Sequence, residues 1–291
     1  CCYHIYLSIL NSNPITIPML PSVSSAGVQS STLALMIEKG EIPMVDAAIF
    51  ADTMGEPKAV YDWLNWLEKQ LSYPIYKVSG GDLTQDSIDN AEGKGKYNFV
   101  EVPLFTKNNE TGKKGLLRRQ CTSNYKIRPV NKKIRELLGL QKGEKRKQGT
   151  NVQLLMGISF DEIIRMKTNQ IKWIENVYPL IDKRIKRKDC QEWFANHYDK
   201  NLPRSACIYC PYKTNTEWKA LKNNFPNEWK QAVEFDKKIR TGTKTDDKVY
   251  VHKDCVPLDE ADLRTNAEKG QPELFHEDFG QLDNCEGLCG V

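Results

Sequence analysis

The chain has 291 residues, of which 40% are hydrophobic, and its formal net charge is +4. This length fits one large domain, or one domain with a smaller appendage, and the composition is sufficient for a buried core. No run of about 18 apolar residues occurs, which argues against a membrane-spanning helix. Residues 1–20 lack a basic segment and contain Pro14 and Pro18, unlike a signal peptide. We therefore expect a cytoplasmic protein without a membrane partner, whose first 20 residues are irregular or displaced from the natural start.

Strand and helix patterns alternate along the first part of the chain. Apolar spacing, with Gly and Pro as stop signals, predicts helices over 29–39, 57–71 and 123–139, and strands over 46–52, 74–79 and 152–159. The polar segments 85–97 and 106–116 are predicted to be loops. This alternation predicts an α/β fold: a Rossmann-like twisted, mainly parallel sheet with helices on both faces. Ligands of such sheets bind beyond the carboxyl ends of the strands.

The character of the sequence changes near residue 183, where short helical pieces begin to alternate with polar loops. We expect a nucleotide-binding domain over residues 21–182 and a Cys-rich C-terminal appendage over 183–291. The nine cysteines are odd in number and unevenly spaced, so they do not form an evident disulfide framework. A metal or redox role in a reducing compartment fits them better.

A loop of small residues precedes the first predicted helix. Residues 24–32 read Ser-Ser-Ala-Gly-Val-Gln-Ser-Ser-Thr, with Ser25, Gly27, Ser30 and Ser31 in a Ser-x-Gly-x-x-Ser-Ser pattern. Small residues let backbone N–H groups approach a phosphate, and a helix N-terminus favours the negative charge. No Gly-Lys-[Ser/Thr] follows, so this is not a Walker loop. An ordinary turn between strand and helix is the alternative interpretation.

The segment 117–129 places a thiol among cations. Arg118 and Arg119 precede Cys121, and Lys126 follows it. Arginine binds phosphate or sulfate oxygens through two parallel hydrogen bonds, and nearby cations favour the thiolate form of cysteine. The alternative is a buried cysteine in a basic surface loop. Further basic runs, at 132–135, 142–147 and 183–188, indicate either a solvated surface or one that contacts polyphosphate or nucleic acid.

Cys207 and Cys210 form a Cys-x-x-Cys motif. This spacing lets two sulfurs share a metal, a cluster or a disulfide. Cys121 is a candidate third ligand, and zinc bound with the help of Cys190 or His197 is an alternative. Two merely structural cysteines are a further interpretation. Cys285 and Cys289 near the C-terminus form a separate candidate pair, in a tail that can equally be disordered.

Taken in order, these segments resemble the phosphoadenosine-phosphosulfate reductase family of the PP-loop (adenine nucleotide α-hydrolase-like) superfamily, over about residues 24–215. Phe50-Ala-Asp-Thr-Met-Gly-Glu-Pro57 is similar to the family's Asp-Thr-Gly segment, with Met54 interpreted as an insertion before the glycine. Gly157 to Arg165 resembles its Gly-x-Arg-x-x-Glu-x-x-Arg region, with Ser159 in place of the first arginine. Gln29 stands where ATP-pyrophosphatase members carry aspartate.

The resemblance implies an adenine nucleotide, either ATP or phosphoadenosine phosphosulfate. Its expected binding residues are Ser25, Gly27, Ser30, Ser31, Asp52, Thr53 and Gly157, with Mg²⁺ as a further candidate ligand of Asp52. The expected catalytic residues are Cys121, Arg119 and Lys126. The resemblance further implies a [4Fe–4S] cluster on Cys121, Cys207 and Cys210, with zinc as the alternative.

Two chemistries follow from this resemblance: reductive cleavage of an adenylyl-sulfate by a thiol, or ATP-dependent adenylation followed by sulfur transfer to a nucleobase or nucleic acid. The implied partners are a nucleic-acid substrate or a thiol reductant protein. The alternative function is a non-catalytic, zinc-stabilised nucleic-acid-binding module. The Gln29 position and the prolines Pro18 and Pro21, which interrupt the strand expected before the loop, favour this alternative.

Overall fold

The computed structural model describes residues 5–8, 19–23, 27–97, 99–145, 149–241, 247–265 and 267–270. The strands in this part of the chain are β1 (Ile5–Ser8), β2 (Met19–Val23), β3 (Ala47–Asp52), β4 (Ile75–Ser79), β5 (Phe105–Lys107), β6 (Lys114–Leu116), β7 (Val152–Met156), β8 (Ile174–Val177) and β9 (Lys248–Tyr250). The α-helices are α1 (Val28–Glu38), α2 (Lys58–Glu68), α3 (Leu83–Ala91), α4 (Arg128–Leu137), α5 (Pro179–Asp182), α6 (Arg187–His197), α7 (Asn215–Asn224) and α8 (Pro226–Lys238). Shorter helical turns are η1 (Ser123–Ile127), η2 (Phe160–Arg165), η3 (Leu258–Glu260) and η4 (Ala267–Lys269).

The chain has a mixed α/β fold with parallel strand pairs. Among the described residues, the larger sheet has the strand order β4-β3-β1-β2-β7-β8. The pairs β3/β4, β2/β7 and β7/β8 are parallel, whereas β1 runs antiparallel to both β2 and β3. Residues 1–20 were expected to be irregular or displaced from the natural start. Residues 5–8 of this segment are not irregular, because they form β1 in the centre of the sheet. Pro21 does not exclude β2 from the sheet, since it aligns with Leu155 of β7.

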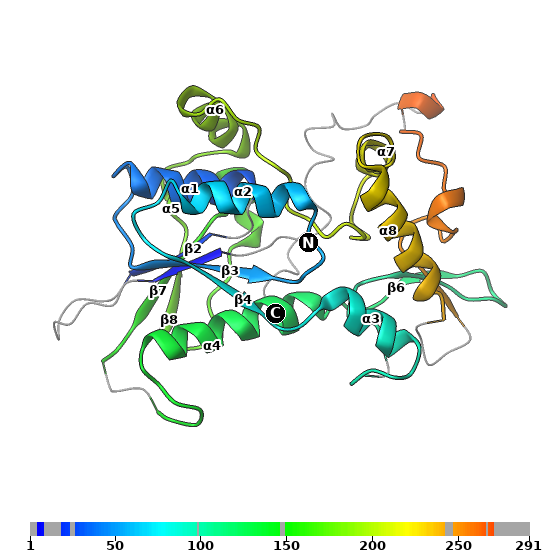
Figure 1. Cartoon of the computed structure of the whole chain (residues 1–291), viewed down its shortest axis with the longest axis horizontal. Helices are drawn as coiled ribbons and strands as arrows, with labels where there is room; N and C mark the ends of the chain where they lie inside the picture. Colours follow the sequence, from blue (N-terminus) through cyan, green and yellow to red (C-terminus); the bar gives the residue numbers. More distant parts are fainter. Residues whose placement is uncertain are drawn as a thin grey trace.

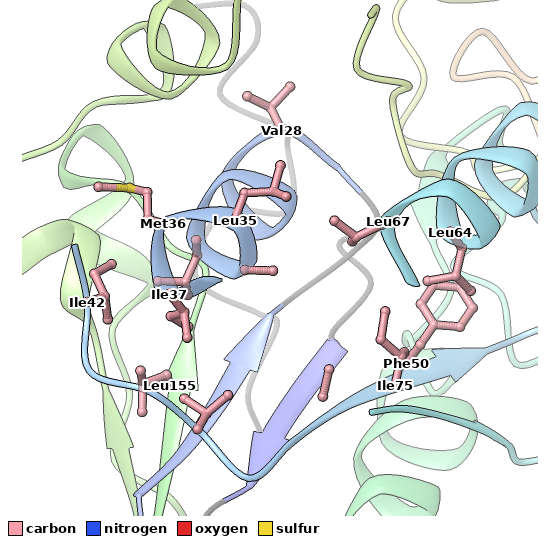
Figure 2. Packing of buried hydrophobic residues seen from close by; sticks show 14 of the residues in the cluster. Val28, Leu35, Met36, Ile37, Ile42, Phe50, Leu64, Leu67, Ile75 and Leu155 are labelled. Carbon is pink, nitrogen blue, oxygen red and sulfur yellow. The ribbon is translucent and has the colours of Figure 1, made fainter. Parts of the chain in front are cut away.

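Helices cover both faces of β3. Ala48 and Phe50 pack in a core with side chains of α1 and α2, such as Leu35 and Leu64. The alternate residues Ile49 and Ala51 pack instead with Val130 and Ile134 of α4. Figure 1 shows α1 and α2 on one side of the strands and α4 on the other. Figure 2 shows Phe50, Leu64 and Ile75 close together where α2 lies over β3 and β4. The period-two alternation along β3 therefore places apolar side chains in two cores.

A further core joins the middle of the chain to its C-terminal part. The smaller sheet, of order β6-β5-β9, is antiparallel, and it lies beside α3, α7 and α8 (Figure 1). Leu83, Leu104 and Cys121 pack there with Trp218 and Phe235. By contrast, α6 packs against α1 through Cys190 and Phe194. Residues beyond 183 thus contribute to two cores that also contain earlier residues.

The helices predicted over 29–39 and 57–71 and the strands predicted over 46–52 and 74–79 are confirmed within a few residues of their expected ends, as α1, α2, β3 and β4. Two predictions are wrong. The segment 85–97 is not a loop throughout, because α3 ends within it, and Asp82 caps this helix by accepting from the backbone N–H groups of Thr84 and Gln85. The segment 106–116 contains the β5–β6 hairpin. Within the described residues, no helix combines the length and the apolar character needed to cross a membrane.

Candidate functional site

The N-terminal end of α1 lies against the residues that follow β7. A Cβ atom on Gly157 would be 2.6 Å from Ser30 Oγ and 2.9 Å from Ser30 Cα, so only glycine fits this contact. Ser30 and Ser31 are fully buried in the first turns of α1, and Trp63 Nε1 donates to Ser31 Oγ at 2.9 Å. The predicted phosphate-binding serines are therefore part of the helix and its packing. Ser25 lies outside the described residues.

Gly27 is the N-cap residue of α1. Its φ of −92° is accessible to any residue, so a positive φ is not what favours glycine here. Lack of a side chain still lets a ligand approach the backbone closely at this position. The first turn of α1 carries no acidic side chain, which leaves its positive dipole end uncompensated by protein carboxylates on that turn.

The carboxyl end of β3 makes a tight turn at Met54. Asp52 Oδ1 accepts from Met54 N at 2.7 Å and from the Tyr61 hydroxyl at 2.9 Å. Met54 has a φ of 58°, in the left-handed region that favours glycine. Gly55 does not adopt a positive φ. Met54, interpreted as an insertion relative to the family's segment, thus itself makes the turn.

The Cys-x-x-Cys segment packs directly onto this turn. Ile208 N donates to Gly55 O at 2.8 Å, and Cys210 N donates to Cys207 O at 3.0 Å. A Cβ atom on Gly55 would lie 2.7 Å from the Tyr209 hydroxyl oxygen. Cys207 Sγ is 3.7 Å from Thr53 Oγ1. The predicted nucleotide residue Thr53 and the predicted metal ligand Cys207 are thus in contact.

Tyr209 anchors this segment from its other side. Its hydroxyl forms a hydrogen bond with Thr84 Oγ1 at 2.8 Å, and its ring stacks on Phe235 with centroids 3.8 Å apart. Burial and the neighbouring Cys207 raise the pKa of Tyr209, so the phenol stays neutral. The two residues between the cysteines therefore hold the motif against β3, α3 and α8.

The Cys121 segment is held at the end of β4. The backbone N–H groups of Gln120 and Cys121 both donate to Glu101 O at 3.0 Å. A Cβ atom on Gly80 would lie 2.6 Å from Asn124 O, within the π-helical turn η1. Lys126 in this turn is 1% exposed. A π-helical turn inside a helix often marks a functional site.

The thiol of Cys121 does not have the lowered pKa that its cationic neighbours predict. Burial raises the pKa of Cys121, and this effect exceeds the opposite effects of Lys126 and Arg119. A negative charge on the Cys210 sulfur also acts to raise the pKa of Cys121, so the sulfurs of Cys121 and Cys210 interact electrostatically. Arg119 lies over the ring of Tyr212 at 5.8 Å, and Arg118 is exposed. Desolvation therefore dominates, and the Cys121 thiol is protonated at neutral pH.

The three candidate metal ligands Cys121, Cys207 and Cys210 share one buried core. In the described part of the chain, however, no group of three or more His, Cys, Asp or Glu residues is arranged to hold a metal ion. The residues present thus do not form a metal site in this conformation. The alternative zinc ligands Cys190 and His197 do not join these cysteines. Cys190 packs in the core with α1, and His197 stacks on Trp193 at the surface. Cys285 and Cys289 lie outside the described residues.

Lys213 was not singled out by the sequence, although it lies in the turn that follows the Cys-x-x-Cys motif. Its backbone N donates to Cys210 O at 3.2 Å. Burial lowers the pKa of Lys213, while the neighbouring Cys210 and Cys207 act to raise it. Lys213 Nζ lies over the ring of Trp218, 5.8 Å from its centroid.

A buried polar network at the start of α1 was also missed. Gln29 Nε2 donates to Glu162 Oε2 at 3.1 Å and lies 3.4 Å from Ser159 Oγ. Arg165 Nη1 pairs with Glu162 Oε2 at 2.8 Å, and Arg187 Nη1 donates to Gln29 Oε1 at 3.2 Å. The resemblance over Gly157 to Arg165 singled out the segment that forms η2. Nothing in the sequence indicated that Arg187 lies beside this segment.

The structure therefore places three sequence-distant segments at the carboxyl ends of strands: the start of α1 at the end of β7, the Cys121 segment at the end of β4 and the Cys-x-x-Cys motif at the end of β3. Asp52, Thr53 and Gly157 lie at these ends.

Comparisons of the chain with protein-family models, curated proteins and solved structures found no match.

Proposed function

We propose that the protein is an adenine-nucleotide-binding enzyme of the phosphoadenosine-phosphosulfate reductase type, built on a Rossmann-like sheet, which carries out sulfur chemistry with cysteine thiols. The observation that supports this most is the contact of the Cys-x-x-Cys segment with the end of β3, through Ile208 N to Gly55 O and Cys207 Sγ to Thr53 Oγ1. It joins a thiol motif to the edge of the sheet where such folds bind ligands.

The nucleotide would bind with its phosphates at the start of α1. Helix N-terminal N–H groups and the helix dipole favour an anion, and the N-cap residue Gly27 has no side chain. Asp52 lies at the end of β3, next to Thr53, and its partly exposed carboxylate is suited to hydrogen bonds with the base or ribose. Asp52 already accepts two hydrogen bonds from the protein, which fix its orientation.

Cys121 is the proposed nucleophile. In adenylyl-sulfate cleavage, its thiolate would attack the sulfur, form an S-sulfonate and release the adenine nucleotide. In the second chemistry, adenylation of an acceptor by ATP releases pyrophosphate. A persulfide on Cys121, loaded by an external persulfide donor, would then attack the activated carbon and displace AMP. A second thiol would cleave the resulting disulfide and release the thiolated acceptor. Both chemistries require a cysteine thiolate. The cations Lys126 and Arg119 favour it, because they act to lower the pKa of Cys121. Because burial opposes ionisation of the Cys121 thiol, we propose that the thiol loses its proton only when the substrate binds.

The [4Fe–4S] cluster, with zinc as the alternative, stays a prediction from the three cysteines, and no step of this proposal depends on it. Purification without oxygen, followed by iron, sulfide and zinc analysis, separates these cases. Stoichiometric zinc in a protein that binds no nucleotide would favour the nucleic-acid-binding module instead. Iron and sulfide would favour the cluster.

Calorimetry with ATP and with phosphoadenosine phosphosulfate tests the proposal first. We expect binding of at least one of them by the parent protein, and the same affinity in Cys121→Ser. Single-turnover assays with trapping of S-sulfonate or cysteine persulfide then test the chemistry. Cys121→Ser should form neither product, whereas Cys190→Ser should retain product formation. Absence of nucleotide binding in the folded parent protein would reject the proposal.

A further inference from the structure

The end of the Cys-x-x-Cys motif faces the segment that carries Cys121. Arg119, two residues before Cys121, lies over the ring of Tyr212 at 5.8 Å, and Tyr212 follows Cys210 by two residues. Cys121 and Cys210 belong to one buried core, and each is 2% exposed. A negative charge on the Cys210 sulfur is also felt at the Cys121 thiol. These contacts bring two thiols that are far apart in the sequence into the same part of the core.

The first cysteine of the motif is directed to a different neighbour. Cys207 Sγ is 3.7 Å from Thr53 Oγ1, at the end of β3. Cys210 N donates to Cys207 O at 3.0 Å, so a tight turn separates the two cysteines. Along the motif, the contacts therefore pass from the end of β3, at Cys207, to the Cys121 segment just beyond Cys210.

This arrangement differs from the one that an iron–sulfur cluster needs. A cluster on Cys121, Cys207 and Cys210 requires three thiolates that are directed at one iron–sulfur unit. Among the residues that the structure describes, no group of three or more His, Cys, Asp or Glu side chains has such an arrangement. All three cysteines are free thiols. Two thiols in one part of the core, with the third directed at β3, instead suit thiol–disulfide exchange.

We propose that Cys210 is the second thiol of the reaction and forms a disulfide with Cys121 as the product leaves. This inference rests on the proposed function and assigns a residue to the release step of both its chemistries. In adenylyl-sulfate cleavage, the Cys210 thiolate attacks Cys121 Sγ, breaks its bond to the sulfonate and releases sulfite. In sulfur transfer, the same attack breaks the bond from Cys121 Sγ to the acceptor's sulfur and releases the thiolated acceptor.

Electrons and protons balance in both cases. Cys210 supplies the electron pair of the new sulfur–sulfur bond, and the pair of the broken bond leaves with the product, as does the Cys210 proton. Relative to its two thiols the protein has then lost two electrons. These reduce the sulfate sulfur to sulfite, or the sulfane sulfur of the persulfide donor to a thiol. A dithiol reductant must then reduce the Cys121–Cys210 disulfide before the next turnover.

Disulfide mapping tests this pair of thiols without any substrate. The parent protein, Cys207→Ser and Cys210→Ser are oxidised with diamide in their folded state, and the linked peptides are identified by mass spectrometry. We expect a Cys121–Cys210 disulfide in the parent protein and in Cys207→Ser. The matched control is Cys207→Ser, because it removes the other thiol of the same motif. A Cys207–Cys210 disulfide in the parent protein, or no disulfide that includes Cys210, would overturn the inference.

Single turnover with phosphoadenosine phosphosulfate, without added reductant, tests the role of the pair. The parent protein and Cys190→Ser should release stoichiometric sulfite and end with the Cys121–Cys210 disulfide. Folded Cys210→Ser should keep the S-sulfonate on Cys121 and release at least roughly tenfold less sulfite, because attack by an internal thiol is lost. Equal sulfite release by Cys210→Ser and the parent protein would overturn the inference.

If thermal unfolding shows that Cys210→Ser does not fold, Cys210→Ala decides by the same measurements. Iron and sulfide that are bound by the parent protein after purification without oxygen, and lost from the folded Cys210 variant, would make Cys210 a cluster ligand and overturn the inference. Each of these failures leaves nucleotide binding, and with it the proposed function, standing. A folded parent protein that binds neither ATP nor phosphoadenosine phosphosulfate would overturn the proposed function, and with it the catalytic role of Cys210, even where the disulfide forms.

Discussion

Cys207 Sγ lies 3.7 Å from Thr53 Oγ1, although 154 residues separate these two side chains in the sequence. Cys207 is 4% exposed and Thr53 is fully buried, so the contact lies inside the protein. It ties the Cys-x-x-Cys motif to the carboxyl end of β3.

Gly55→Ala should disturb the junction. The new Cβ would lie 2.7 Å from the Tyr209 hydroxyl oxygen, so Tyr209 must leave Thr84 or the β3–α2 turn must shift. Overpacking of this kind costs about 1–3 kcal/mol of unfolding free energy, measured by denaturant unfolding. Gly115→Ala is the control, because its Cβ would meet only Thr106 Oγ1, the end of an adaptable side chain. Equal stabilities of Gly55→Ala and the parent would contradict the close packing.

Met54→Gly should stabilise the protein. Met54 is 53% exposed and has a φ of 58°, so little packing is lost when its side chain is removed. Relief of left-handed strain, set against the entropy of an added glycine, should raise the unfolding free energy by about 1 kcal/mol. Met44→Gly, at an equally exposed position outside the left-handed region, should not be stabilising. A destabilised Met54→Gly would show that the Met54 side chain contributes more than its exposure implies.

Asp46 makes stability depend on pH. Burial raises the pKa of Asp46 to about 7, and its Oδ2 is buried without a hydrogen-bond partner. In the unfolded chain the carboxyl ionises near pH 4, so between about pH 4 and pH 7 the folded state binds more protons and stability falls as the pH rises. Above pH 7 the full destabilisation is present.

Asp46→Asn should therefore leave stability nearly unchanged at pH 4 and raise it at pH 8. We expect a gain of roughly 1–2 kcal/mol, because solvent reaches part of this half-buried carboxyl and screens its charge. Chemical denaturation at both pH values measures the difference. A gain of the same size at pH 4 would show that charge is not its cause.

The sequence predicted the parts of the fold that repeat a strong pattern. Val60, Trp63, Leu64 and Leu67 recur at helical spacing, and α2 forms there with these four side chains buried. The helix α3 was missed because its buried positions include Ser87 and Asn90, which weaken the apolar pattern. The antiparallel strand β1 was missed because pairing in the centre of a sheet depends on partners elsewhere in the chain.

The candidate site was predicted as segments but not as contacts. Thr53 and Cys207 were both singled out, yet nothing in the sequence indicates that they touch. The pKa of Cys121 was predicted to fall because Arg119 and Lys126 are close in sequence, whereas the opposing burial comes from tertiary packing. The turn at Met54 and the contact of Arg187 with Gln29 depend on backbone conformation and on long-range packing.

Cys190→Ala should separate structural from functional thiols. Cys190 is fully buried between α6 and α1, in a different core from the Cys-x-x-Cys motif. Burial raises its pKa to about 12, so it is not a thiolate at neutral pH. Removing its sulfur should lower the unfolding free energy by roughly 1 kcal/mol through the small cavity left behind. Nucleotide affinity and metal content should both remain those of the parent. A loss of bound zinc would instead assign Cys190 to a metal site.

The most direct test of the nucleotide site is the ATP affinity of Gly157→Ala, measured by calorimetry beside the parent protein and Gly115→Ala. The added Cβ would lie 2.6 Å from Ser30 Oγ and 2.9 Å from Ser30 Cα, so the first turn of α1 must move away from the end of β7. We predict that the parent and Gly115→Ala bind ATP equally, and that folded Gly157→Ala binds it at least roughly tenfold more weakly because the helix N-terminus no longer holds its position. A folded Gly157→Ala with the affinity of the parent would contradict a nucleotide site at the start of α1.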